Sequence, residues 1–158
     1  IWNEPDGGTF WARSYEQYLE AWAHGVRAAR AVRPNVKIVG PSIAHFTADW
    51  MGKFLNDCAD LLVLPDVVSW HEWGDSGSEI PSNVRAARAI IASLGQHATG
   101  RCSEISINEM VPSQFNFNPG VHVSYFANLE RAHVDSACHS CWPEPTQGEV
   151  CSANRFGV

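Results

Sequence analysis

The chain has 158 residues, 45% of them hydrophobic and 18% charged, which is the composition of a globular protein and not of a disordered one. Its formal net charge of −6 provides no cationic surface for a nucleic-acid backbone. The sequence also contains no apolar run close to the roughly 20 residues that a membrane-spanning helix needs. We therefore expect neither nucleic acid nor a membrane as a partner.

Helices and strands are expected to alternate along the chain. Residues 14–33 carry apolar side chains at spacings of three and four, and Ser14 with Gln17 matches a capping box. Ile1 and Trp2, at the start, resemble the tail of a buried strand. The later predicted segments are, in order, strand 36–40, helix 47–62, strand 66–73, a helix from Pro81 stopped at Gly95, strand 104–109, a helix from Pro119 through Leu129, and strand 136–142.

This alternation predicts an α/β fold with a parallel sheet and right-handed crossovers. Two architectures fit the pattern, a small doubly wound sheet and part of a (β/α)8 barrel. The sequence has no Gly-rich phosphate-binding loop of either common type, so nucleotide binding is unsupported.

Polar or aromatic residues stand at the carboxyl ends of the expected strands. A barrel gathers these ends around one mouth, whereas an open sheet spreads them along a line. A full barrel needs about 250 residues, so we predict a partial (β/α)8 TIM barrel over residues 1–158, from the end of strand four through strand eight, with the N-terminal half of the barrel absent. The residues concerned are Asn3, Glu4, Pro41, Ser42, His71, Trp73, Asn108, Glu109 and Trp142.

Two of these strand-end residues are carboxylic acids, Glu4 and Glu109. On the barrel interpretation they face each other across the mouth. Two opposed carboxyl groups are what glycoside hydrolysis requires, one to protonate the leaving oxygen and one to attack or stabilise the anomeric carbon. The structural alternative is that Glu4 caps the following turn and Glu109 forms a salt bridge.

The order of motifs "WNEP", "KIVGPS", "DVVSWH" and "INE" resembles the clan of retaining glycosidases built on (β/α)8 barrels, and most closely glycoside hydrolase family 39, the β-xylosidase and α-L-iduronidase family. The resemblance extends from Trp2 to Trp142. It implies that Glu4 is the general acid/base and Glu109 the nucleophile. It also implies that Asn3 hydrogen-bonds the sugar 2-hydroxyl.

The resemblance extends to a set of substrate-binding residues. His71 would lie in the cleft, and Trp142 would form a floor for the sugar ring. Trp73 replaces the tyrosine that the family commonly has there, and an indole N–H can donate but not accept a hydrogen bond. Asn108 and Glu149 complete the expected set, with Glu144 as a further loop acid; solvated loop acids are the alternative for the last two.

We therefore predict a retaining glycoside hydrolase that needs no metal or organic cofactor and acts on an oligo- or polysaccharide, with a β-xyloside as the first choice. The alternatives are a non-catalytic carbohydrate-binding barrel and another specificity of the same clan, such as a β-glucanase, cellulase or arabinosidase. A chain of this length is expected to be inactive alone. The five cysteines are compatible with secretion, and the sequence does not define the oligomeric state.

Overall fold

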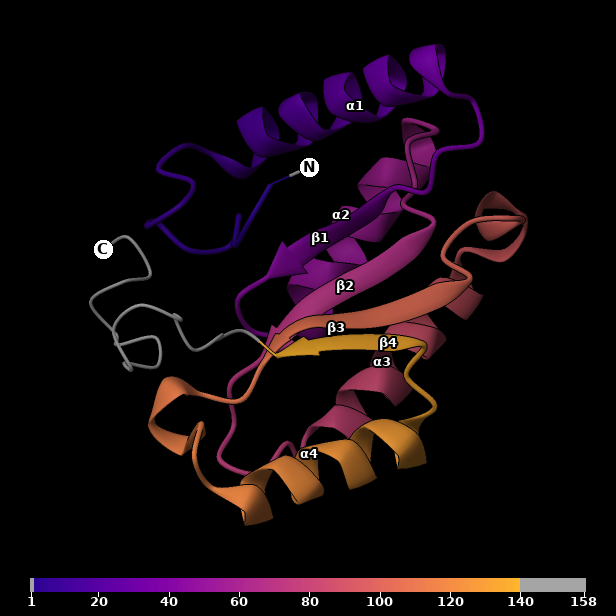
Figure 1. Cartoon of the computed structure of the whole chain (residues 1–158). Helices are drawn as coiled ribbons and strands as arrows, with labels where there is room; N and C mark the ends of the chain where they lie inside the picture. Colours follow the sequence, from indigo (N-terminus) through magenta and orange to yellow (C-terminus); the bar gives the residue numbers. More distant parts are fainter. Residues whose placement is uncertain (1, 140–158) are drawn as a thin grey trace.

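Strand and helix alternate along residues 2–139, the part of the chain that the computed structural model describes (Figure 1). In chain order the elements are α1 (Tyr15–Val32), β1 (Val39–Ile43), α2 (Ala48–Asp60), β2 (Val67–Glu72), α3 (Ile80–Ser93), the 3-10 helix η1 (Gly95–Ala98), β3 (Glu104–Met110), the 3-10 helix η2 (Ser113–Phe115), α4 (Pro119–Ala132) and β4 (Ser136–His139).

The helices begin where their capping residues predict. The Ser14 side chain accepts from the backbone of Gln17 and the Gln17 side chain accepts from the backbone of Ser14, which confirms the capping box of α1. Thr47 caps α2 by accepting from the Trp50 N–H, and Asn118 caps α4. No described helix is both long enough and apolar enough to cross a membrane.

The first strand is displaced from its predicted position. It was expected at 36–40 but runs over Val39–Ile43, through the cis Gly40–Pro41 bond. Pro41 has no N–H to donate to a ladder, but β1 is an edge strand of the described sheet, where proline is tolerated. Trp2, expected with Ile1 in the tail of a buried strand, lies outside the described strands and its side chain is 48% exposed, while Ile1 lies outside the described residues.

The four described strands form one parallel sheet in the order β1-β2-β3-β4. Each helix packs against the next one in the chain, from α1 through α2 and α3 to α4. Figure 1 shows the helices following one another past the sheet, with α1 at the top and α4 at the bottom. A doubly wound sheet reverses its strand order at a switch point. The described sheet does not, so its winding is that of a barrel segment.

The core lies between the sheet and the row of helices. All six residues of β2 are buried, and Trp22, Phe54 and Trp70 are among the largest fully buried side chains. A Cβ atom on Gly40 would lie 2.5 Å from the Trp22 ring, so α1 can approach β1 this closely only over a glycine. The Trp22 indole also donates to the carbonyl of Val63 at 3.0 Å, which satisfies its polar atom inside the core.

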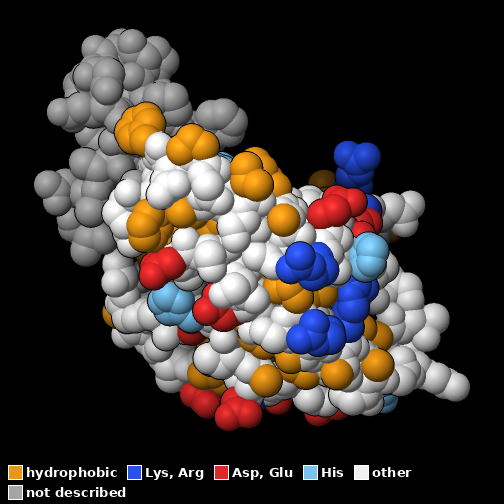
Figure 2. Space-filling model, turned by 90° about the horizontal axis from the view of Figure 1, so that it is seen from below, with side chains coloured by type: hydrophobic (Ala, Val, Ile, Leu, Met, Phe, Trp, Pro, Cys, Tyr) orange, Lys and Arg blue, Asp and Glu red, His pale blue; other side chains and the backbone are white. Residues whose placement is uncertain are grey.

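Apolar side chains remain exposed outside this core. On α4, Val123 and Phe126 are 66% and 57% exposed, and Phe117 just before the helix is 81% exposed. Figure 2 views the molecule from the α4 side and shows hydrophobic side chains on this face. On the two outer strands, Val39 of β1 and the first three residues of β4 are also exposed.

Candidate active site

Glu4 is held at the carboxyl end of β1 by the turn that carries it. Its N–H donates to the carbonyl of Ser42 at 2.9 Å, and its backbone has a φ of 44°. Two residues later, the Asp6 carboxylate accepts from the backbone N–H groups of Ala44 at 2.8 Å and His45 at 3.4 Å. The loop that precedes α1 is thus fastened to the strand end, and the Glu4 side chain is directed by backbone contacts.

Two register shifts in the sheet position the remaining residues of the site. Between β2 and β3, Trp70 lies opposite Ile107 but His71 lies opposite Glu109, so Asn108 is an extra residue. Between β1 and β2, a similar shift leaves Ser42 as the extra residue. Such bulges interrupt the strict alternation of side chains and redirect the residues beside them. This explains how the neighbours Asn108 and Glu109 can both contribute to one site.

His71 lies between the two glutamates. Its side chain is fully buried, with Nδ1 3.0 Å from Oε1 of Glu4 and Nε2 3.7 Å from Oε1 of Glu109. Nε2 is buried and has no hydrogen-bond partner within the described part of the chain. The ligand atoms of the three side chains all lie within 4.8 Å of one another. The predicted catalytic pair and the predicted cleft histidine therefore form one cluster.

The electrostatic environment keeps Glu109 from ionising easily. Burial raises the pKa of its carboxyl group, the positive charge of His71 opposes this, and the negative charge of Glu4 raises it further. Among the described residues, the ion pairs of both glutamates involve His71 and no lysine or arginine. The site thus brings two carboxylates together with only a histidine between them.

The other predicted residues are placed as follows. Asn3 is half-buried beside Glu4. Trp73 is half-buried with its ring edge-on to that of His71, the centroids being 5.8 Å apart. The Asn108 amide donates to the hydroxyl of Ser42 at 2.9 Å. The predictions for Trp142, Glu144 and Glu149 lie outside the described residues.

Two polar residues near this end of the sheet have structural roles that the sequence motifs did not indicate. Ser42, noted only as a strand-end residue, contacts both Glu4 and Asn108. Glu72 follows His71 on the buried strand, and one of its oxygens accepts from Trp70 at 2.6 Å and from Asn83 at 2.8 Å. Burial raises the pKa of Glu72. Alternation along β2 could have indicated that Glu72 points away from His71.

The cluster can serve two kinds of chemistry. One imidazole and two carboxylates are ligand types that divalent cations accept. The same pair of carboxylates, close together and of unequal environment, can also supply an acid and a nucleophile without a metal. From the sequence, we predict that the reaction needs no metal.

Comparison with known proteins decides the family. The model of "Glycosyl hydrolases family 39" matches residues 1–101, which include Asn3, Glu4, His71 and Trp73. The chain belongs to glycosyl hydrolase family 39. The match to this family ends before β3, so Glu109 lies beyond the matched residues.

One curated relative and two solved structures are similar to this chain. A beta-xylosidase of Geobacillus stearothermophilus is 34% identical over 74 residues, 46% of this chain and 15% of the relative. The structure of N2152 from Neocallimastix frontalis matches 90% of this chain and 34% of its own, with a TM-score of 0.75 and 30% identity. A monomeric beta-xylosidase from Caulobacter crescentus CB15 matches 94% of this chain and 36% of its own, with a TM-score of 0.66 and 20% identity. The chain spans about a third of each of these structures and corresponds to part of a glycosidase TIM barrel.

Proposed function

We propose that this chain carries the two catalytic glutamates of a retaining glycoside hydrolase, Glu4 as general acid/base and Glu109 as nucleophile. The observation that supports this most directly is the separation of their facing carboxylate oxygens, which is within 4.8 Å. Inverting enzymes place the two carboxyl groups about 6.5–9.5 Å apart to admit a water molecule, and retaining enzymes about 5–5.5 Å apart. The short separation favours direct attack by one carboxylate.

The proposed reaction proceeds in two displacements. In the first, a carboxylate oxygen of Glu109 bonds to the anomeric carbon, the glycosidic C–O bond breaks, and Glu4 gives its proton to the leaving oxygen. In the second, Glu4 takes a proton from water, the water oxygen bonds to the anomeric carbon, and the bond to Glu109 breaks. Each glutamate thus returns to its starting state, and the product keeps the anomeric configuration of the substrate.

His71 contributes to this cycle through its position. The hydrogen bond between its Nδ1 and Oε1 of Glu4 fixes the orientation of the acid/base. Its electrostatic effect lowers the pKa of Glu109 and so favours the ionised form, which is the form that attacks. Trp73 would form one apolar wall beside this pair, and Asn3 would bind the sugar next to the acid/base.

The proposed substrate is a β-xyloside within an oligo- or polysaccharide. The support is the family and the relative named a beta-xylosidase, which is similar to this chain over 74 residues. We further propose that the chain corresponds to the end of barrel strand four through strand eight, with β1 to β4 as strands five to eight. The remaining strands would complete the cleft, so activity is expected of the full-length protein.

A mechanism-based inhibitor tests this proposal. The full-length protein is incubated with an activated 2-deoxy-2-fluoro-β-xyloside, which forms the covalent intermediate but breaks it down slowly. We expect a mass increase of one fluoroxylosyl group on the peptide that contains Glu109. Hydrolysis of an aryl β-xyloside with retention, followed by NMR of the first-formed sugar, is the companion measurement.

The outcomes separate the alternatives. A product that first appears as the α-anomer would overturn the retaining mechanism, and a label on another residue would overturn the role of Glu109. Binding of xylan without hydrolysis would support the non-catalytic carbohydrate-binding alternative. Hydrolysis of a β-glucan or an arabinoside in place of the xyloside would keep the mechanism and change the substrate.

A further inference from the structure

We infer that Ser42 is a positioning residue for the proposed catalytic pair, because its hydroxyl group joins the two bulges that aim Glu4 and Glu109. This inference rests on the proposed function and extends it to a residue outside the reacting groups. Ser42 contacts neither the anomeric carbon nor the leaving oxygen in the proposed reaction. Its effect would pass through the backbone of Glu4 and the side chain of Asn108.

The backbone of Ser42 is in a conformation that glycine adopts more easily. Its φ is 61°, in the left-handed region, and the residue is 6% exposed. A residue with a side chain is held in this region at a conformational cost, and such residues gather at functional sites. A glycine would fit the same bulge at lower cost. The hydroxyl group is therefore the feature that can favour serine over glycine at this position.

The hydroxyl group has two partners on two different strands. It hydrogen-bonds the hydroxyl of Ser69 on β2 at 3.0 Å and accepts from the amide of Asn108 on β3 at 2.9 Å. The carbonyl of the same residue accepts from the N–H of Glu4 at 2.9 Å. One buried residue thus connects the Glu4 turn, the His71 strand and the residue directly before Glu109.

The connection joins the two places where the sheet departs from regular register. Ser42 is the extra residue of the β1–β2 pairing and Asn108 that of the β2–β3 pairing. Each bulge alone leaves its extra residue without a cross-strand ladder partner. The hydrogen bond between the two extra residues restrains both bulges relative to each other. A displacement of about 1 Å in a reacting group can cost roughly 100-fold in rate.

The test is the variant Ser42→Gly in the full-length protein. Glycine keeps the backbone carbonyl that holds Glu4 and suits the φ of 61°, so the backbone contact stays while the side chain with its hydroxyl group is removed. We expect kcat on an aryl glycoside to fall about 10- to 100-fold and KM to change less than about threefold. The thermal midpoint should change little, because the relieved backbone cost offsets part of the loss of the two buried hydrogen bonds.

Ser106→Ala is the matched control. Ser106 is also 6% exposed, lies on β3 two residues before Asn108, and forms one hydroxyl–hydroxyl bond, to Ser136 at 3.0 Å. It touches neither glutamate, so its loss should leave kcat within about twofold of the parent. Equal losses of kcat in the two variants would overturn the inference, because a general weakening of the sheet would then explain both.

A double-mutant comparison tests the route through Asn108. If the Ser42 hydroxyl acts by holding that amide, Ser42→Gly should reduce kcat far less in an Asn108→Ala background than in the parent. Fully additive losses would show that Ser42 does not act through Asn108. Unchanged kcat in Ser42→Gly beside an active parent would overturn the whole inference and leave the proposed function intact.

A measurement without turnover keeps the inference testable if the parent hydrolyses no glycoside. The carboxyl carbon of Glu109 is followed by 13C NMR through a pH titration in the parent and in Ser42→Gly. We expect the Glu109 midpoint to fall in the variant, because a looser bulge lets water reach the carboxylate. An unchanged midpoint would show that the Ser42 hydroxyl does not restrain Glu109. An inactive parent with a shifted midpoint would reject the proposed function and retain the positioning role.

Discussion

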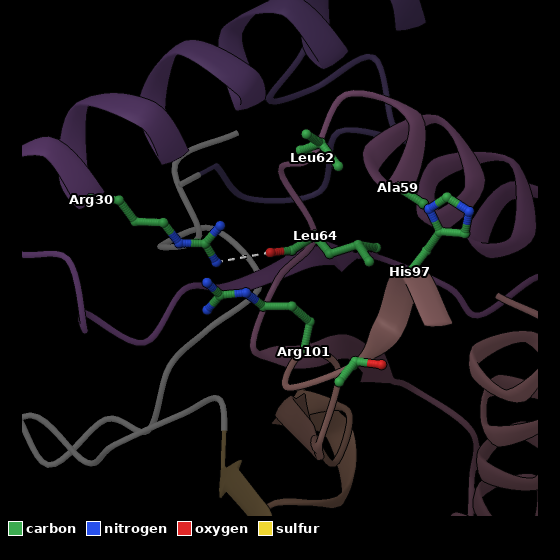
Figure 3. A pocket seen from close by; sticks show the side chains of 7 residues that line it. Arg30, Ala59, Leu62, Leu64, His97 and Arg101 are labelled. Atoms are coloured by element: carbon green, nitrogen blue, oxygen red, sulfur yellow. Dashed lines mark hydrogen bonds between the residues drawn. The ribbon is translucent and has the colours of Figure 1, made fainter. Parts of the chain in front are cut away.

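The two ends of the sheet surround a carboxylate with different partners: Asp66, at the amino end, is buried, and Glu109, at the carboxyl end, is half-buried. At the amino end, just before β2, Asp66 accepts from the N–H of Ile38 at 2.8 Å and from the guanidinium groups of Arg30 and Arg101. Burial alone would raise the pKa of Asp66, but these donors lower it. Figure 3 shows Arg30 and Arg101 beside each other at this end, with Arg30 also donating to the carbonyl of Leu64 at 3.0 Å.

At the carboxyl end, Glu109 has His71 and a second carboxylate as its neighbours, and its pKa is raised. The amino end therefore compensates its buried charge and contributes to stability. The carboxyl end leaves the half-buried carboxylates Glu4 and Glu109 poorly compensated, which costs stability and suits acid–base and nucleophilic chemistry. Substitutions at the two ends should accordingly have opposite effects on stability and activity.

The largest effect on activity is expected from Glu109→Gln, which keeps the shape and removes the nucleophile. We expect kcat/KM on an aryl β-xyloside to fall by about 10⁴-fold or more. A raised folded-state pKa stabilises the fold below the unfolded-state pKa, and this contribution is lost as pH rises through the folded value. The neutral amide avoids that loss, so the thermal midpoint at pH 7 should match or exceed that of the parent. A clear fall in the thermal midpoint of Glu109→Gln would show that the carboxyl end also compensates its charge, as the amino end does.

The largest effect on stability is expected from Asp66→Ala at the other end. Removing this carboxylate leaves two guanidinium groups and the N–H of Ile38 without their partner, at a cost of about 2–4 kcal/mol in the free energy of unfolding. Denaturant unfolding measures this cost, and kcat per folded molecule should stay within about twofold of the parent. The exposed Asp60, at the end of α2, provides the control Asp60→Ala, for which little change is expected.

The pH dependence of the stability lost in Asp66→Ala shows whether the lost charge is its cause. A lowered folded-state pKa contributes stability above the unfolded-state pKa, and this contribution is lost as pH falls through the folded value. The difference between parent and Asp66→Ala should therefore shrink as the pH falls through the Asp66 transition. A difference that is constant across this range would assign the loss to packing and not to charge.

The sequence predicted the features that local patterns determine. The capping box at Ser14 and the apolar strand predicted at 66–73 depend on short-range rules, and the structure confirms the box and places the strand at Val67–Glu72. The carboxyl-end position of Glu4 and Glu109 followed from counting alternating segments. Their closeness followed only from choosing a barrel over an open sheet, a choice that rests on the pattern of the whole chain.

The features that the sequence did not reveal depend on how neighbouring strands align. Val36 and Ile38 have strand-like side chains, yet the ladder begins at Val39, because the N–H and carbonyl of Ile38 are engaged by Asp66 and Val67. The bulges at Ser42 and Asn108 are properties of pairs of strands, and one sequence carries no local signal for a register shift. For that reason Ser42 was noted only as a strand-end residue.

The smallest expected effect, and the sharpest test of the carboxyl end, is a pair of distinct changes in one pH profile. The acid limb of kcat/KM reports the ionisation of the free enzyme's nucleophile. In the proposed active form Glu4 is protonated and uncharged when Glu109 ionises, so the neutral Glu4→Gln should leave the acid limb in place and remove the basic limb. His71 lowers the pKa of Glu109, so His71→Gln should move the acid limb to higher pH.

An aryl glycoside with a strongly activated leaving group makes this comparison possible, because its departure needs little help from an acid and Glu4→Gln retains measurable turnover. Glu4→Gln preserves the shape of its side chain, whereas His71→Gln also replaces a buried ring, so the thermal midpoint of His71→Gln is measured beside its pH profile. An acid limb that His71→Gln leaves in place would mean that solvent access controls the Glu109 carboxyl group. A shift to higher pH in His71→Gln alone would show that His71 controls it, which is the feature that separates this end of the sheet from the arginine-compensated one.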